Sequence, residues 1–213
     1  MRPKRVILLP HLPITCRIEP GSCPCACMAA LSCSTSSSRS RTSASPPSAH
    51  SDGGVLRDHI DFWRAEPTGK FYLYRALQDD LAEGPLAPTP MTTLDFGLTI
   101  LRTAEATAVP MTFARAMGLT PEETTLYFAF RWSRLRDREL SAWANPERFI
   151  FPGYVCRQPE VTSGVAVPLE TPTSAIARFV RDVTAELFAA FNCFAPGPGV
   201  VEDLTAQLLN RGL

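Results

Sequence analysis

The sequence is poor in the residue patterns that most often carry chemistry. It has only three histidines, and two of them, His11 and His50, lie in an irregular N-terminal stretch, so a histidine-rich metal site or a serine triad has little material. It contains no G-x-x-x-x-G-K-S/T phosphate loop, and no G-x-G-x-x-G follows a predicted strand. No segment approaches the roughly 18 uninterrupted apolar residues of a membrane span. We therefore expect a cytoplasmic protein that is not an enzyme of a recognisable kind, and we assign no catalytic residue.

Acidic residues are almost missing from the first fifty positions, where Glu19 is the single acid. The apolar run 6–9 imitates a secretory signal, but Pro10 and Pro13 interrupt it and no cleavage site follows. From Cys16 to His50 the chain is rich in Ser, Arg, Pro and Cys and shows no hydrophobic periodicity. This composition predicts that residues 1–52 are a disordered tail. A mis-assigned start or a shifted reading frame would explain it equally well.

Three closely spaced cysteines in this tail, Cys23, Cys25 and Cys27, are candidate metal ligands. Their thiolates could bind a soft ion such as Zn²⁺ or Cu⁺. The paired C-x-x-C spacing of a structural zinc site is missing, so incidental cysteines in a tail are the favoured interpretation. The residues themselves predict no cofactor.

Residues 53–213 predict a single α+β domain. Bulky apolar residues recur at every second position of 124–133, from Leu126 to Trp132, which is typical of a strand with one buried face. Residues 161–169 repeat the alternation, and Pro168 suits an edge strand or a strand end because proline cannot donate to a ladder. Apolar residues at spacings of three and four predict helices near 94–117 and 172–191. We expect a small antiparallel sheet packed against these helices.

Other segments carry weaker patterns. Leu56, Ile60 and Trp63 predict a short helix, and 71–81 predicts another, although its start could also be a strand. Thr93 is a candidate N-cap, and Pro110 predicts a kink or a break in the helix that follows. We expect Trp143, Phe149 and Phe151 to anchor a connection to the core.

Arginines are concentrated after the first predicted strand, at Arg131, Arg134, Arg136 and Arg138. A guanidinium is a fixed fork of donors, so this strip is a candidate site for anions or nucleic acid. Alternation would place the last three on one face and Arg131 on the other. An ordinary solvated edge is the favoured alternative, since Asp137 and Glu139 can neutralise the strip. We therefore expect residues 55–213 alone to bind duplex DNA weakly or not at all.

Three segments carry a family resemblance: RDHIDFWRAEPTGKFYLYRALQDDL, FRWSRLRDRELSAWANPERF and VVEDLTAQLLNR. From about residue 56 to residue 213 the chain resembles the region that follows the nucleic-acid-binding module in some bacterial Schlafen AlbA-like proteins, which are often labelled DNA-binding or ATP-binding. The resemblance implies a detached C-terminal region. The signature module should lie upstream, so no nucleic-acid-binding residue of the family transfers to this chain, and ATP is implied only by the resemblance.

Two functional hypotheses follow. The first is a non-enzymatic effector domain that binds a ligand, a protein partner or an upstream nucleic-acid-binding module, as part of a bacterial DNA-binding regulator. The second is a free-standing nucleotide-binding domain or enzyme that uses the strip from Arg131 to Arg138. The first is favoured because the apolar faces are clear while the chemical groups are scattered.

Overall fold

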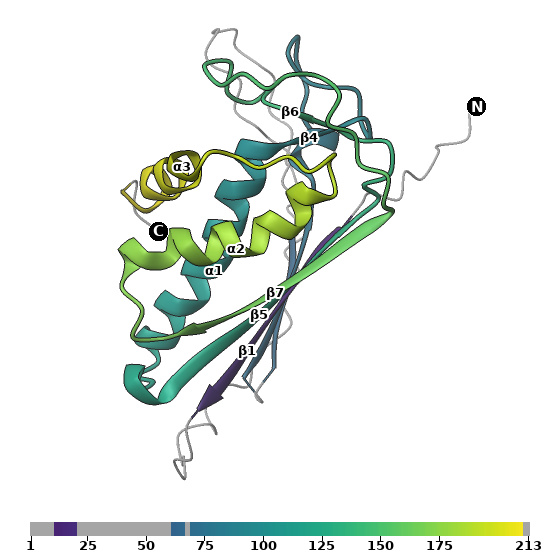
Figure 1. The fold of residues 1–213 in the computed structure, drawn as a ribbon. Helices are drawn as coiled ribbons and strands as arrows, with labels where there is room; N and C mark the ends of the chain where they lie inside the picture. Colours follow the sequence, from purple (N-terminus) through teal and green to yellow (C-terminus); the bar gives the residue numbers. More distant parts are fainter. Residues whose placement is uncertain (1–10, 21–60, 67–68, 211–213) are drawn as a thin grey trace, which may run out of the picture.

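The computed structural model describes residues 11–20, 61–66 and 69–210. They form an α+β domain, as predicted, in which helices cover one face of an antiparallel five-stranded sheet (Figure 1). The strands of this sheet are β1 (His11–Pro20), β2 (Asp61–Glu66), β3 (Lys70–Ala76), β5 (Thr124–Ser133) and β7 (Glu160–Pro168), and their order is β2-β3-β1-β5-β7. A short parallel pair, β4 (Thr93–Asp95) and β6 (Glu139–Ser141), lies apart from the sheet.

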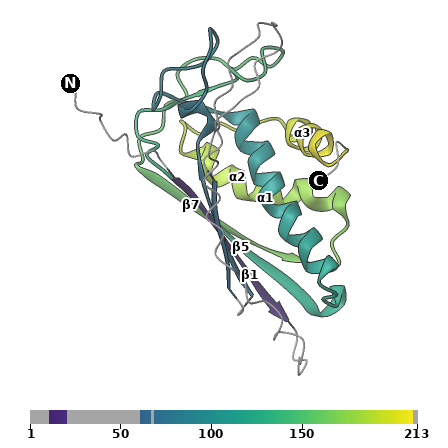
Figure 2. The same ribbon diagram turned by 180° about the vertical axis from the view of Figure 1, so that it is seen from behind.

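The helices are α1 (Phe96–Ala116), α2 (Ile176–Ala189) and α3 (Pro198–Asn210). In the opposite views of Figures 1 and 2 all three gather on the same side of the sheet. The prediction of helices near 94–117 and 172–191 is confirmed, although a turn of 3-10 helix at Thr173–Ala175 precedes α2. Of the kink or break predicted at Pro110, the break is wrong, because α1 continues through that residue. The N-cap of α1 is Asp95 in place of the predicted Thr93.

The core lies between the helices and the inner face of the sheet. In β5, Leu126, Phe128, Phe130 and Trp132 are all buried, and the residues between them are not. Phe179 and five further apolar residues of α2 are buried against this layer. The two predicted strands and their alternation are therefore confirmed, and β7 is an edge strand that ends at Pro168.

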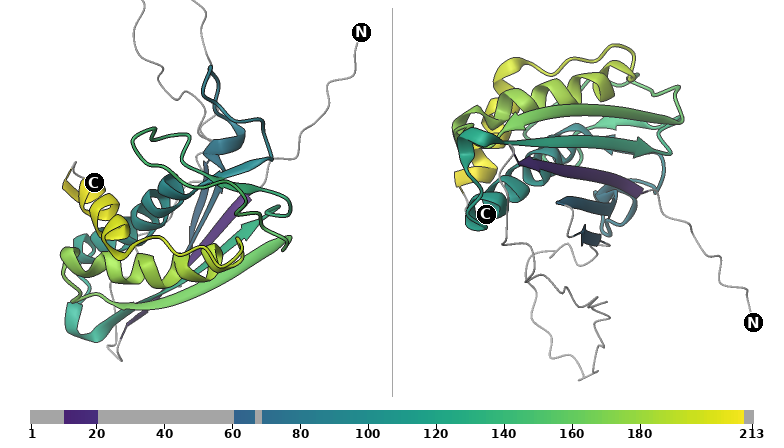
Figure 3. Two further views of the ribbon diagram at one scale, coloured as in Figure 1. Left: turned by 45° about the horizontal axis from the view of Figure 1, so that its top comes forward. Right: turned by 90° about the horizontal axis from the view of Figure 1, so that it is seen from below.

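The prediction of a wholly disordered tail is wrong for residues 11–20, which form β1. This strand lies in the middle of the sheet, between β3 and β5 (Figure 3, right). The register pairs Ile14, Cys16 and Ile18 with Phe130, Phe128 and Leu126. An alternation was present in the sequence, since Leu12, Ile14, Cys16 and Ile18 are apolar, but prolines and basic residues around it concealed the pattern. The rest of the predicted tail lies outside the described residues.

The two helices predicted between 56 and 81 are also wrong where the structure describes them. Trp63 lies in β2, and residues 70–76 form β3, followed by a 3-10 turn at Gln78–Asp80. Leu56 and Ile60 lie outside the described residues. The segment Phe71-Tyr72-Leu73-Tyr74 is a strand with large side chains on both faces, so neither a period of two nor one of 3.6 stood out clearly.

Candidate functional site

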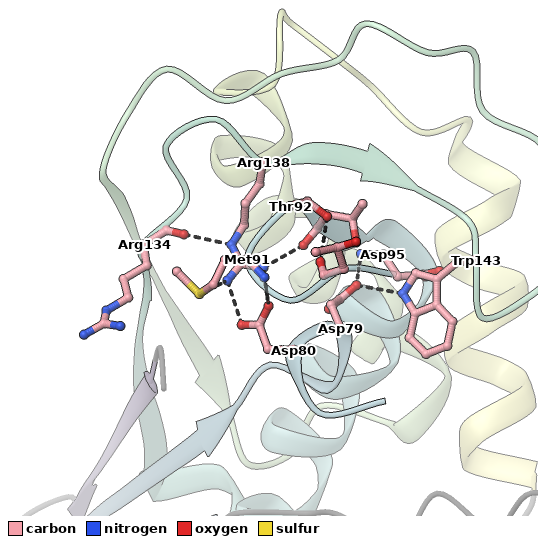
Figure 4. A network of polar contacts seen from close by, with 10 residues as sticks. Asp79, Asp80, Met91, Thr92, Asp95, Arg134, Arg138 and Trp143 are labelled. Carbon is pink, nitrogen blue, oxygen red and sulfur yellow. Dashed lines mark hydrogen bonds and ion pairs between the residues drawn. The ribbon is translucent and has the colours of Figure 1, made fainter. Parts of the chain in front are cut away.

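A buried ion pair joins the segment after β3 to the turn after β5. The Arg138 guanidinium donates through Nη1 and Nη2 to the two carboxylate oxygens of Asp80, at 2.9 and 2.7 Å (Figure 4). Its other N–H groups donate to the Arg134 carbonyl, the Thr93 carbonyl and Met91 Sδ. Both side chains of the ion pair are fully buried. All five donors of the guanidinium therefore have an acceptor inside the protein, as a buried charge requires.

Two further carboxylates lie beside this ion pair. Asp79 Oδ1 accepts from the Asp95 backbone N–H at 2.6 Å and from Trp143 Nε1 at 2.9 Å (Figure 4). Asp95 caps α1 by accepting from the Leu98 N–H, and its second oxygen accepts from the Ala144 N–H at 3.0 Å. The pKa of Asp79 is raised to about 6, mainly by burial and to a smaller extent by the nearby Asp95 charge, while the hydrogen bonds from Trp143 and the Asp95 N–H act in the opposite direction. Burial also raises the pKa of Asp95.

The carboxylates Asp79 and Asp95 hold the beginning of a long loop, residues 142–153. They bind Trp143 through its indole and Ala144 through its backbone N–H. The far end of the loop is fixed by Gly153, whose N–H donates to Glu139 and whose carbonyl accepts from Asn192 Nδ2 at 2.6 Å. This loop is therefore tied to the domain at both ends.

The middle of the loop is also attached. Arg148 forms an ion pair with Asp203 of α3, and Ile150 is partly buried against the core. The Arg148 and Glu147 N–H groups both donate to Asn145. A loop with this many fixed points loses little conformational freedom when it binds a partner.

Two phenylalanines of this loop project into solvent. Phe149 and Phe151 are 77% and 72% exposed, more than any other large hydrophobic residue described. Their rings meet edge to face, with centroids 5.0 Å apart. The prediction that they anchor the loop to the core is therefore wrong, and that task falls to Ile150 and Trp143. We define Phe149 and Phe151 as the aromatic pair.

The predicted arginine strip is dispersed. Residues 134–138 form a turn after β5, so strand alternation does not apply to them. Arg138 is buried with Asp80, while Arg131 lies on the sheet and pairs with Glu160. Arg134, which has a positive φ, and Arg136 are exposed on the turn. The structure therefore does not bring the four guanidinium groups together on one surface.

The predicted metal ligands Cys23, Cys25 and Cys27 lie outside the described residues. Within the described residues, no group of three or more His, Cys, Asp or Glu side chains could hold a metal ion. No described helix is long and apolar enough to cross a membrane. Comparison of the chain with protein-family models, curated proteins and solved structures found no match.

Sequence reasoning missed the three buried carboxylates and the aromatic pair. A helix over 71–81, as predicted, would place Asp79 and Asp80 on its polar side, and the predicted arginine strip treats Arg138 as a surface charge. One local signal was available, because Asp95 stands between Leu94 and Phe96, both of which are buried. The partners themselves lie too far apart in the chain for any local pattern to reveal them, as with Asp80 and Arg138.

Proposed function

We propose that this chain is a non-enzymatic binding domain that recognises a protein partner through the aromatic pair, Phe149 and Phe151. The main support is that the two most exposed large apolar side chains among the described residues lie on a loop that is fixed at both ends. Aromatic residues on a preorganised surface are typical anchors of protein interfaces. Transfer of such a side chain from water into a partner's pocket contributes roughly 1.5 to 3 kcal/mol.

The arrangement of charges supports binding over catalysis. Arg138 and Asp80 satisfy each other, while Asp79 and Asp95 accept hydrogen bonds that hold a strand, a helix start and the loop. A nucleotide-binding domain that uses Arg131–Arg138 has less support, because Arg138 has no donor left for a phosphate. The proposal includes the effector role that the Schlafen AlbA-like resemblance implies for such a region.

The test compares three forms of the full chain: wild type, F149S/F151S, and the control F113S. Phe113 is also exposed, at 52%, but lies on α1. A photo-crosslinker at position 149 identifies the bound protein in a lysate of the source cells, and the purified partner is then titrated with each form. We expect F149S/F151S to weaken the affinity at least about tenfold, as loss of two aromatic anchors implies, and F113S to leave it unchanged. Equal affinities for all three forms would refute the proposal.

A further inference from the structure

The sheet face opposite the helices carries aromatic and cationic side chains in alternation. The strand register places Phe62 opposite Tyr74 and Arg64 opposite Tyr72 on neighbouring strands β2 and β3. The Phe62 and Tyr74 rings are 6.1 Å apart and tilted. Phe62, Arg64 and Tyr74 are exposed, and Tyr72 is partly exposed. In the described residues no helix covers this face (Figures 1 and 3).

The pattern continues across β1 to β5 on the same face. Lys70 and Tyr127 both pair in register with Arg17, so they lie at the same level of the sheet. Tyr127 is 44% exposed, and the next residues of β5 on this face are the exposed Ala129 and Arg131. Successive side chains on one strand face are about 6.7 Å apart. The face therefore presents rows of aromatic rings interspersed with positive charges.

The register also places acids on this face, among them Glu19, two positions beyond Arg17 on β1. Glu160 pairs with Arg131, but both side chains are about half exposed, so the pair contributes little and the guanidinium can exchange it for a phosphate. Glu66 pairs in register with Lys70 at one edge. The face therefore has four aromatic residues, with Arg64, Lys70 and Arg131 between them. These groups match a polymer in which each unit has one flat ring for stacking and one negative charge.

We propose that this face binds single-stranded nucleic acid, with bases stacked on Tyr127, Tyr74 and Phe62 and phosphates near Arg64, Lys70 and Arg131. An open antiparallel sheet with aromatic side chains stacks unpaired bases without reading their sequence. A duplex keeps its base faces stacked inside, so it can meet only the cations. The inference concerns a different surface from the aromatic pair of the loop and does not rest on the proposed function.

The test is fluorescence anisotropy of the full chain with labelled oligonucleotides of about 15 nucleotides, within the site sizes of single-strand binding folds. We expect micromolar binding of oligo(dT) or oligo(U) and at least about tenfold weaker binding of a duplex of equal length. Y127A and Y74A should each weaken single-strand binding at least about fivefold, the lower bound for loss of one stacked base, whereas Y127F should retain it. R131Q should make the dependence of log affinity on log salt about 0.7 less steep.

F149S/F151S is the matched control and should bind the oligonucleotides like wild type, which separates this inference from the proposed function. Inorganic polyphosphate, which has charge but no bases, should compete poorly. Three results would overturn the inference: no single-strand binding, equal binding of the duplex, or unchanged binding by Y127A and Y74A. If polyphosphate competed as strongly as oligo(dT), charge alone would explain the binding, and base stacking would be refuted.

Discussion

Arg138 and Asp80 form a two-pronged ion pair in which both side chains are fully buried. Removal of one partner leaves a buried charge without compensation, which costs far more than the ion pair itself contributes. We expect R138M and D80L each to lower the free energy of unfolding by roughly 3 to 5 kcal/mol. The double variant D80L/R138M should lose less than the sum of the two. Urea unfolding of the four proteins measures this coupling, and simple additivity would contradict the uncompensated-charge argument.

The pKa of Asp79 predicts an unusual dependence of stability on pH. The folded-state value of about 6 exceeds the ordinary 3.8, so the contribution of this group is full below pH 3.8 and is lost as the pH rises through 6. D79N keeps the acceptor oxygen and removes the charge. It should therefore be more stable than wild type at pH 7.5, by roughly 1 to 3 kcal/mol, and this advantage should vanish toward pH 4.

D79A provides the contrast to D79N, because it removes the acceptor for the Asp95 N–H and Trp143 Nε1. It should destabilise the protein at both pH values. Chemical denaturation at a series of pH values gives the free energy of unfolding as a function of pH for wild type, D79N and D79A. A constant difference between D79N and wild type from pH 4 to 7.5 would mean that Asp79 titrates in its ordinary range.

Core packing between sheet and helix gives a third prediction. Phe130 of β5 and Phe179 of α2 are 1% and 6% exposed, so F130A and F179A should each cost roughly 3 to 5 kcal/mol. F113A removes an identical side chain from the exposed face of α1 and should change stability by less than about 0.5 kcal/mol. Thermal and urea unfolding of the three variants provide the comparison. A wild-type melting temperature for either core variant would show that the face is wrongly assigned.

The central position of β1 predicts the effect of truncation. Deletion of residues 1–20 removes the strand that pairs with both β3 and β5, so the sheet is divided and two strand edges are exposed. We expect this form to lose cooperative unfolding and to aggregate. Deletion of residues 1–10 leaves β1 in place and should preserve the melting transition. Circular dichroism during heating distinguishes the two truncated forms. If both showed the same melting transition, β1 would not be necessary for the fold.

The elements that could be predicted from the sequence are those whose two faces differ strongly in hydrophobicity. In β5, Phe128 and Phe130 alternate with the exposed Tyr127 and Ala129, so the period of two was clear. In β3 the exposed Tyr74 follows Leu73, and aromatic residues on the outer face removed the contrast. The same aromatic residues that make the outer face a candidate binding surface thus made its strand difficult to predict.

The candidate sites depend on contacts that no local pattern contains. Asp79 holds Trp143, and Arg148 pairs with Asp203, in each case across a large part of the chain. Phe149 and Phe151 are as apolar as core residues, yet they face outward, while Ile150 between them is partly buried against the core. Hydrophobicity predicts that a residue can be buried, whereas the direction of a loop depends on what the rest of the chain places beneath it.

The central position of β1 in the sheet also affects when its strand pairs can form during folding. Ile14 pairs with Phe130, more than half the chain away, so this contact closes a very large loop. During synthesis β1 is the first of the described strands to emerge from the ribosome, yet its partner β5 follows only after β2, β3 and α1. Contacts this distant in sequence slow folding, and the waiting edge is open to other chains. Until β5 has been synthesised, the edge of β1 that β5 covers in the folded sheet therefore has no strand to pair with.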